Sequence, residues 1–267
     1  MRTADPRRTL HDALDAAGRV LKARFGKVAV KYKGRANIVT QADLESQEAI
    51  LELVRSRHPE HDFKAEEAAV KDTGADVVWA IDPLDGTTNF AHGYPASCVS
   101  IGVLRAGKPW LAGILDPFRD ETFTAEAGKG ARLNGRPTRV SRTPRLSEAL
   151  LVTGFAYDRA ERSHYYVEFY RDFMTRCHDV RRSGSAALDL AWIAAGRADG
   201  FWEFGLSPWD VAAGRLLVEE AGGRVTDFTG KPWGALGSWG ERTLATNGRV
   251  HAAMLGVIRK HLERQNA

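Results

Sequence analysis

The first part of the chain alternates between helical and extended patterns. Apolar residues recur at helical spacing from about residue 6 to 25, which predicts an amphipathic helix that ends just before Gly26. Alternation over 28–33 predicts a short strand or an extended arm. A second helix is predicted after residues 37–43, and Pro59 ends it. Its apolar stripe is expected to consist of Leu44, Ile50, Leu51 and Val54.

The middle of the chain has the patterns of a sheet. The apolar run 77–81 predicts a buried strand, and a polar turn that begins with Asp82 follows it directly. Residues 97–104, 110–115 and 121–125 are strand-like and are separated by short turns, with a further turn at residues 134–135. Short connections between strands predict an antiparallel meander.

Strand-like and helix-like segments alternate in the last part of the chain. Strands are predicted at 149–153, 200–204, 225–226 and 243–246, and helices at 161–176, 186–195, 209–221 and 250–262. Such alternation implies helices packed on a sheet. We expect a single domain over residues 1–267, with an N-terminal α+β half (1–146) and a C-terminal α/β half (147–267).

Composition narrows the possible functions. The 267 residues are 43% hydrophobic, which is enough to bury a sizeable core. The excess of 38 Lys and Arg over 34 Asp and Glu is small and spread out, so it does not indicate a nucleic-acid-binding surface. Trp192, Trp202, Trp209 and Trp233 are expected to pack in the core or an interface, not to stack on bases. No segment approaches ~18 uninterrupted apolar residues, so we expect no membrane contact and a cytoplasmic location.

Cysteine and histidine do not predict a metal site. Cys98 and Cys177 belong to no Cys/His cluster and are interpreted as two buried thiols. His58 and His61 flank Pro59 at a predicted helix end and are interpreted as surface residues. No histidine accompanies the acidic residues of the central turn, which argues against zinc there.

Asp82 and Asp85 are candidates for a metal-binding pair. Two carboxylates on one short turn raise each other's pKa unless a cation neutralises them, and Pro83 stiffens the turn. With the backbone carbonyl of Leu84 they would offer oxygen ligands, which suit Mg²⁺. The alternative is a pair of turn-forming aspartates. Glu66 also has an ordinary alternative, an acid on a solvated loop, and Asp210 could simply be an acid at a helix start.

The residues after Asp85 add a second function to the same turn. Gly86 permits close backbone approach, and successive N–H groups at Thr87 and Thr88 can form an anion-binding nest. Metal ligands beside a phosphate cradle predict a metal-assisted phosphatase. The sequence contains no P-loop motif, so we do not expect nucleotide hydrolysis of that kind.

Two segments resemble the signatures of a known family. Residues 79–90, Trp-Ala-Ile-Asp-Pro-Leu-Asp-Gly-Thr-Thr-Asn-Phe, are similar to the first signature of the inositol monophosphatase family. Residues 209–214, Trp-Asp-Val-Ala-Ala-Gly, followed by Glu-Glu-Ala-Gly-Gly at 219–223, resemble the second. The resemblance also includes the Glu-Glu pair at 66–67, the segment 40–43 and the segment 182–187, so it covers essentially the whole chain.

This resemblance implies a fold and an activity. The fold would be α+β, a layered αβαβα sandwich of the type shared with fructose bisphosphatases, usually dimeric. The activity would be hydrolysis of phosphate monoesters with two or three Mg²⁺ ions, often inhibited by Li⁺. The residues that resemble the family's metal ligands are Glu66, Asp82, Asp85, Asp210 and, through its carbonyl, Leu84.

The resemblance also implies catalytic and substrate-binding roles. Thr87, with Asp43 behind it, resembles the pair that orients the attacking water together with Glu66. The amides of Gly86 and Thr87 would hold the phosphate. The residues that resemble the family's contacts to the rest of the substrate are Arg182, Gly184, Ser185, Ala186, Glu203 and Asp210. One departure is Ala65, where the family often has Gly; a positive φ there would strain the loop that carries Glu66.

The substrate predicted from the resemblance is myo-inositol 1-phosphate, which residues 88–90 (Thr-Asn-Phe) favour over the substrates of sister phosphatases. Alternatives within the same fold are broad specificity, histidinol phosphate and fructose bisphosphate. An alternative of another class is a regulatory partner of the transcription or RNA machinery. The intact set of acidic ligands favours an enzymatic function over a purely regulatory one.

Overall fold

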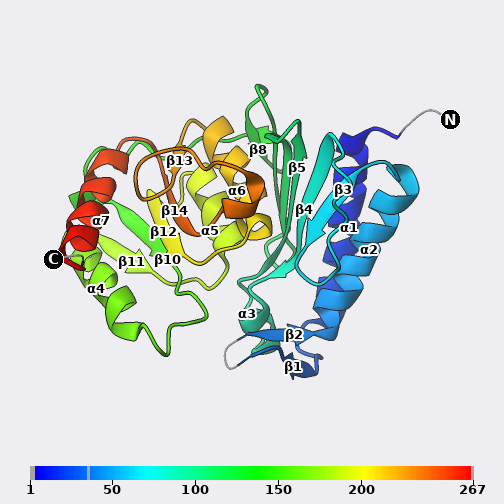
Figure 1. Ribbon diagram of the computed structural model, residues 1–267, viewed down its shortest axis with the longest axis horizontal. Helices are drawn as coiled ribbons and strands as arrows, with labels where there is room; N and C mark the ends of the chain where they lie inside the picture. Colours follow the sequence, from blue (N-terminus) through cyan, green and yellow to red (C-terminus); the bar gives the residue numbers. More distant parts are fainter. Residues whose placement is uncertain (1–3, 35–36, 266–267) are drawn as a thin grey trace.

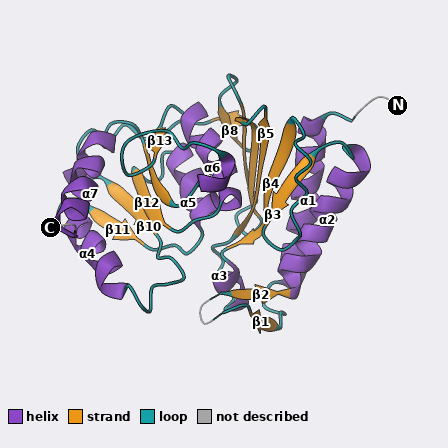
Figure 2. Ribbon diagram, in the orientation of Figure 1, coloured by secondary structure: helices purple, strands orange, loops and turns teal. Residues whose placement is uncertain are grey.

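Five layers of helix and sheet make up the part of the chain that the computed structural model describes, residues 4–34 and 37–265 (Figure 1). Within these residues the strands form one sheet of seven strands, one of five and a small ribbon of two. Helices cover the outer face of each large sheet, and two more helices fill the space between the sheets (Figure 2). The predicted αβαβα sandwich is therefore confirmed.

Two amphipathic helices form the first layer. α1 (Pro6–Arg24) begins after Asp5, whose side chain accepts a hydrogen bond from the backbone N–H of Arg7. α2 (Gln41–Arg57) packs against α1 and against the larger sheet. Its buried face includes Ile50, Leu51 and Val54 as predicted, but the prediction for Leu44 was wrong, since that side chain is 38% exposed. Near the start of α2 most of the buried residues are polar, namely Asp43, Ser46 and Gln47.

The larger sheet follows the order of its strands in the sequence. β3 runs parallel to β4 and every other neighbouring pair is antiparallel, so the predicted meander is confirmed. A separate antiparallel ribbon joins β1 (Val30–Tyr32) and β2 (Ile38–Thr40). The strands of the larger sheet are β3 (Asp62–Ala65), β4 (Val77–Asp85), β5 (Cys98–Arg105), β6 (Lys108–Asp116), β7 (Glu121–Glu126), β8 (Ala131–Leu133) and β9 (Arg136–Pro137).

β4 is longer than the sequence predicts. The polar turn was expected to begin at Asp82, but Asp82 still pairs with Ser100 and Asp85 with Cys98, with a shift of register between them. This irregularity accommodates Pro83, which has no N–H to donate to a ladder. The chain turns only at Gly86, and the short helix α3 (Thr87–Ala91) follows. The acidic residues are therefore held by a sheet and not by a free loop.

α5 (Ala186–Ala194) and α6 (Pro208–Glu220) lie between the two sheets. The smaller sheet has the order β11-β10-β12-β14-β13, in which β10 is parallel to β11 and β12 and the remaining pairs are antiparallel. Its strands are β10 (Leu150–Thr153), β11 (Asp179–Arg181), β12 (Gly200–Phe204), β13 (Arg224–Thr226) and β14 (Arg242–Thr246). β11 was not predicted.

The last layer consists of α4 (Ser163–Met174) and α7 (His251–Gln265), which pack on the outer face of the smaller sheet. Two 3₁₀ turns, Leu146–Glu148 and Leu236–Ser238, lie in connections. Cys98 is buried as predicted, whereas Cys177 is partly exposed. Among the described helices, none has both the length and the apolar character that a membrane span needs.

Candidate functional site

A cavity of about 770 Å³ opens between the N-terminal and C-terminal halves of the chain. It is lined by segments that are far apart in the sequence: the end of β4, the start of α3, the starts of α5 and α6, and the end of β12. Every residue predicted to bind metal or substrate lines it, and only Asp43 lies behind the wall. The predicted residues on the wall are Glu66, Asp82, Leu84, Asp85, Gly86, Thr87, Arg182, Gly184, Ser185, Ala186, Glu203 and Asp210.

Asp85 joins the two halves. Its Oδ2 accepts hydrogen bonds from the Ser185 hydroxyl at 2.6 Å and from the Ala187 N–H at 2.7 Å. These donors belong to the first turn of α5, where free N–H groups and the helix dipole favour an anion. Burial still raises the pKa of Asp85 above its usual value, although these hydrogen bonds oppose the rise.

Asp82 is surrounded by negative charge. It is 2% exposed, and the Leu84 N–H donates to its Oδ1 at 2.9 Å. Burial is the largest cause of a pKa well above the usual range, and the neighbouring carboxylates of Glu66, Asp85 and Asp210 add to it. The like charges therefore lie close enough to oppose one another's ionisation.

Glu66 leaves the end of β3 on a loop that other elements hold. Its N–H donates to the Ile81 carbonyl at 3.2 Å, and the next N–H, of Glu67, donates to Gln47 Oε1 at 2.8 Å. Burial, followed by nearby carboxylates, raises the pKa of Glu66 to about 7, against the effect of Lys33, whose ammonium lies 3.7 Å from Oε1. Ala65 does not have a positive φ, so Ala in place of Gly causes no strain there.

Thr87 and Asp43 form a pair at the cavity wall. The Thr87 hydroxyl lies 2.9 Å from Asp43 Oδ1 and 3.0 Å from the Leu84 carbonyl. Asp43 is fully buried and also accepts from the N–H and the hydroxyl of Thr40, at 2.8 and 2.6 Å. Because the single proton of the Thr87 hydroxyl is directed to one of these acceptors, its free lone pairs can accept a hydrogen bond from water in the cavity.

Gly86 makes the turn between β4 and α3 possible. Its φ of 88° lies in the left-handed region that favours glycine. A Cβ there would lie 2.9 Å from the Ala96 carbonyl oxygen and 3.2 Å from that of Gly184. Gly86, Thr87 and Thr88 line the cavity at this turn, and the first N–H groups of a helix have no acceptor within it.

Asp210 stands at a helix start and also lines the cavity. It is the third residue of α6, and its Oδ2 accepts from the Ser207 N–H at 2.7 Å, as an acid at a helix start does. It also lines the cavity, where burial, Asp85 and Glu66 raise its pKa well above the usual range. The helix therefore fixes the carboxylate, which still faces the acidic cluster.

The far wall of the cavity carries two more buried acids. Glu203 on β12 is 7% exposed, and burial raises its pKa to about 8 against the opposing effect of Arg182. Asp189 on α5 is 1% exposed and accepts from the Ser183 hydroxyl at 2.6 Å. Asn89 connects this wall to the turn, because its amide donates to the Ser183 carbonyl at 2.8 Å and to the Ala96 carbonyl at 2.6 Å.

The donor set fits a hard divalent cation. Four carboxylates share one side of the cavity, and all have raised pKa values. The positive charge of Lys33 opposes the rise for Glu66. Such mutual repulsion is relieved when a cation binds among them. The set offers oxygen and no histidine or thiolate, and oxygen ligands suit Mg²⁺. Residues of the wall that the sequence did not predict include Lys33, Asn37, Tyr94, Tyr157, Arg159 and Asp189.

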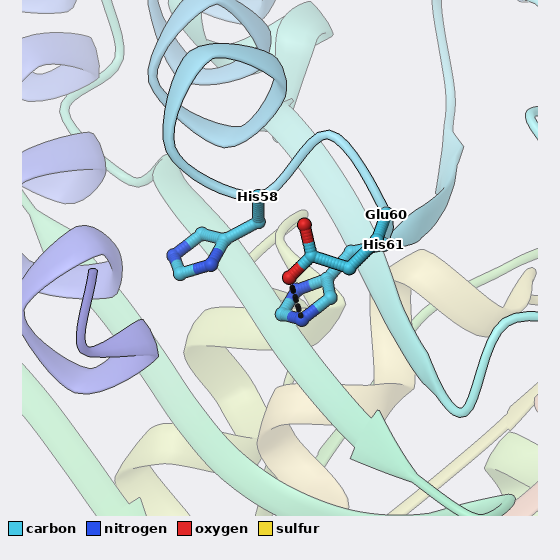
Figure 3. A group of neighbouring side chains, drawn as sticks. All are labelled: His58, Glu60 and His61. Atoms are coloured by element: carbon cyan, nitrogen blue, oxygen red, sulfur yellow. Dashed lines mark ion pairs between the residues drawn. The ribbon is translucent and has the colours of Figure 1, made fainter. Parts of the chain in front are cut away.

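A second group of potential metal ligands lies at the end of α2 (Figure 3). His58, Glu60 and His61 each have one ligand atom within 4.8 Å of the others. Both histidines are buried, at 1% and 9% exposure, so the prediction that they lie on the surface was wrong. Their partners come from distant elements: His58 Nε2 lies 3.0 Å from the Thr9 hydroxyl, and His61 Nδ1 accepts from the Trp79 indole at 3.0 Å.

This second group does not fit a metal. Because Trp79 donates to Nδ1 of His61, the neutral ring carries its proton on Nε2, which faces Glu60 at 3.4 Å and has no free lone pair. The two imidazole rings are also stacked, with centroids 4.6 Å apart and planes within 5°. The lone pairs of parallel rings lie in separate planes and cannot point at one ion. The group is a packed histidine pair.

Comparisons with known proteins show what this chain is similar to. A model of the inositol monophosphatase family matches residues 5–265. An inositol-1-monophosphatase from Synechocystis sp. is 48% identical over 90% of this chain and 84% of its own length. A protein named Nus factor SuhB from Pseudomonas aeruginosa is 43% identical over 90% of this chain and 89% of its own. The solved structure of an inositol monophosphatase from Anabaena (Nostoc) sp. is 46% identical, covers 96% of this chain and 97% of its own, and has a TM-score of 0.83.

Proposed function

The chain belongs to the inositol monophosphatase family, and on that premise we propose that it is a Mg²⁺-dependent hydrolase of phosphate monoesters. One observation carries the proposal: buried carboxylates with raised pKa values share a cavity with Thr87 and the N–H groups at the start of α3. Groups that suit a divalent cation and groups that suit a phosphate thus lie in one place. Hydrolysis of a phosphate ester uses both.

We propose that Glu66, Asp82, Asp85, Asp210 and the Leu84 carbonyl hold two or three Mg²⁺ ions. The ions supply positive charge, which attracts the phosphate and makes a nearby water more acidic. The protein's own groups position the reactants. The Thr87 hydroxyl, held by Asp43, accepts a hydrogen bond from the attacking water, and Glu66 orients the same water. No covalent phosphoenzyme is required.

The remaining wall binds the substrate in this proposal. The N–H groups of Gly86 and Thr87 donate to the phosphate oxygens. Arg182, Gly184, Ser185, Ala186, Glu203 and Asp210 face the leaving group. Carboxylates that line a polar wall accept hydrogen bonds from hydroxyl groups, which suits a polyol such as myo-inositol 1-phosphate. The relative from Synechocystis named inositol-1-monophosphatase supports this substrate over histidinol phosphate and fructose bisphosphate. A homodimer, a cytoplasmic location and inhibition by Li⁺ remain part of the proposal.

Asp82→Asn tests the proposed chemistry. The amide keeps the acceptor for the Leu84 N–H but removes a negative charge from the centre of the carboxylate cluster. We expect kcat for myo-inositol 1-phosphate with Mg²⁺ to fall by several orders of magnitude while the protein stays folded by circular dichroism. Asp72→Asn is the matched control, because it removes the charge of a side chain that is 67% exposed and does not line the cavity. Near-normal turnover in Asp82→Asn would contradict the proposal.

A substrate panel tests the choice of leaving group. The wild-type enzyme should show its highest kcat/KM for myo-inositol 1-phosphate among inositol, histidinol and fructose phosphates at fixed Mg²⁺. A higher value for histidinol phosphate would replace inositol phosphate as the substrate and leave the reaction class intact.

A second candidate function is a partner role in the transcription or RNA machinery. It is supported by the relative named Nus factor SuhB, which is 43% identical to this chain over 89% of its own length. This identity is close to that of the relative named as an inositol phosphatase, so similarity alone does not separate the two roles. Pull-down of RNA polymerase components from the source cells by the wild type and by Asp82→Asn separates them. Equal capture by both proteins would show a partner role that does not need the metal site.

A further inference from the structure

Glu203 is a buried acid whose side chain the rest of the protein leaves unpaired. It is 7% exposed, and among the described residues no hydrogen-bond or ion-pair partner of its carboxyl group is found. The two carboxyl oxygens are not fully enclosed, so they are reached from the cavity that Glu203 lines. A buried carboxyl group without a partner in the protein is available to a hydroxyl group of a ligand.

Gly154 lies opposite Glu203 on the neighbouring strand. β10 and β12 are parallel, and their last paired residues are Thr153 and Trp202. The residues that come next are Gly154, directly after β10, and Glu203, which is still part of β12. Residues opposite each other on paired strands have their side chains on the same face of the sheet. The Glu203 side chain therefore has a glycine beside it, and Gly154 also lines the cavity.

A side chain at position 154 would take the place of the Glu203 carboxyl group. A Cβ built there overlaps the carboxyl carbon and both carboxyl oxygens of Glu203. The backbone conformation is no obstacle to a side chain, because Gly154 does not have a positive φ. The absence of a side chain at this position is therefore what lets the Glu203 carboxyl group lie against the end of β10.

Only the end of one flexible side chain would have to move to make room at Gly154. At Gly86, by contrast, the atom nearest to a Cβ is the Ala96 carbonyl oxygen, which belongs to the backbone. A side chain at position 154 would displace the Glu203 carboxyl group through its χ angles and leave both strands in place.

We propose that Gly154 is a specificity-determining residue: because it has no side chain, it fixes where the Glu203 carboxyl group lies, and so selects leaving groups that carry a hydroxyl group at that point of the cavity. The inference rests on the proposed phosphatase function, in which Glu203 faces the leaving group. It adds the residue that decides where this contact is made. Gly154 is a positioning residue that acts through Glu203.

The test compares two substrates that differ in their hydroxyl groups and not in the type of ester. Myo-inositol 1-phosphate and cyclohexyl phosphate both release a secondary alcohol on a six-membered ring, so the ratio of their kcat/KM values reports the contribution of the hydroxyl groups. The ratio is measured with Mg²⁺ for the wild type, Gly154→Ala, Glu203→Ala and the double variant.

We expect Gly154→Ala to lower this ratio about tenfold, because one hydrogen bond to a buried carboxyl group is worth roughly that factor. Glu203→Ala should lower it at least as much. In the double variant Gly154→Ala should change the ratio by less than about twofold, because no carboxyl group remains to be displaced. A ratio in Gly154→Ala within about twofold of the wild type overturns the proposal, and so does a second tenfold fall in the double variant.

Gly256→Ala is the matched control. Gly256 lies in α7, does not line the cavity, has no positive φ, and a Cβ there would meet nothing within 4 Å. This variant should keep the ratio of the wild type. Circular dichroism checks that each variant is folded. Loss of the fold in Gly154→Ala would contradict the proposal, which requires that only the Glu203 side chain moves.

Two further measurements keep this proposal apart from the phosphatase function. Absence of turnover of every phosphate ester by the wild type with Mg²⁺ would contradict that function. Crystal structures then still test the position of Glu203: a displaced carboxyl group in Gly154→Ala supports the proposal, and an unchanged one overturns it. Calorimetric titration of myo-inositol 1-phosphate tests the specificity: binding weakened about tenfold by Gly154→Ala supports it, whereas equal binding by both proteins, or binding by neither, overturns it.

Discussion

Gly86 is the residue on which the shape of the site depends most directly. Its φ of 88° and the position that a Cβ would take, 2.9 Å from the Ala96 carbonyl oxygen and 3.1 Å from Ser97 Cβ, both exclude a side chain. We expect Gly86→Ala to lower the free energy of unfolding by about 2–3 kcal/mol, from left-handed strain and from crowding. Urea unfolding at neutral pH measures the change.

Gly128→Ala separates the two causes. Gly128 also has a positive φ, 76°, but a Cβ there would meet nothing within 4 Å. This variant should lose only the strain, about 1 kcal/mol. Equal losses in the two variants would show that crowding against Ala96, Ser97 and Gly184 does not constrain the turn.

Residue types predicted the acidic side of the site better than the rest of it. Asp82 and Asp85 follow an apolar strand, and Asp210 stands at a helix start, so their positions could be inferred from local pattern. The burial of His58 and His61 could not, because it depends on Thr9 and Trp79, which come from other elements. Likewise nothing in its neighbouring residues places Tyr157 on the cavity wall.

At the scale of elements, long periodic segments were predictable and short or irregular ones were not. α1, α2, α6 and β5 agree with their predicted positions to within a few residues. α1, α6 and β5 each bury a largely apolar face, and α2 does so over its second half. β11 has three residues, two of them charged, so its sequence lacks the apolar run of a buried strand. The extension of β4 through Pro83 depends on its pairing with β5, which the sequence of β4 does not contain.

The start of α7 should make stability depend on pH. His251, the first residue of α7, is 1% exposed, and its ring nitrogens each lie 3.0 Å from a hydroxyl, of Thr226 on β13 and Thr246 on β14. The Thr226 hydroxyl also donates a hydrogen bond to the Asp227 carbonyl at 2.8 Å, so its hydrogen is not available to His251. The ring therefore donates from Nε2 to Thr226 and accepts at Nδ1 from Thr246, and it is neutral in this arrangement.

Burial, followed by the charge of Arg224, lowers the pKa of His251 from 6.5 to about 4. The unfolded chain therefore binds a proton as the pH falls below about 6.5, while the folded protein excludes it until about pH 4. The stability that depends on neutral His251 is complete above pH 6.5, and about 3 kcal/mol of it is lost on acidification to pH 4.

His251→Gln isolates this effect. Glutamine cannot titrate, so urea unfolding should show a fall in stability between pH 7 and pH 4 that is about 3 kcal/mol smaller than in the wild type. His58 and His61, whose pKa values burial also lowers, contribute equally to both proteins and cancel in the difference. The same fall in wild type and variant would contradict the assignment.

At the scale of the molecule, the cavity lies where the two halves of the chain meet. The larger sheet uses residues 62–137 and the smaller sheet residues 150–246, and Asp210 reaches the carboxylates of β4 from α6. The order of strands in the smaller sheet could not be read from the sequence, since β13 pairs with β14 and not with β12, the strand before it. The close approach of acids from both halves was predictable only through the family resemblance.

This arrangement should make Mg²⁺ a stabiliser of the fold. Without a cation, carboxylates from both halves repel one another, and a ligand that binds only the folded state stabilises it by mass action. At a hundredfold excess over Kd the gain is about 2.7 kcal/mol, which corresponds to a rise in Tm of roughly 5–10 °C for a chain of this size. Differential scanning calorimetry against NaCl of equal ionic strength measures it.

The Asp82→Asn variant and the pH dependence then test whether the acidic cluster causes the stabilisation by Mg²⁺. Asp82→Asn should lose the response to Mg²⁺, yet without Mg²⁺ it should melt no lower than the wild type, because one repelling charge has been removed. Asp72→Asn, whose exposed carboxylate lies outside the cavity, should respond as the wild type does. The response should weaken below pH 7, since the pKa of Glu66 is raised to about 7 and protons then compete with the cation. A full Mg²⁺ response in Asp82→Asn would show that the stabilising cation does not bind among the carboxylates at the junction of the two halves.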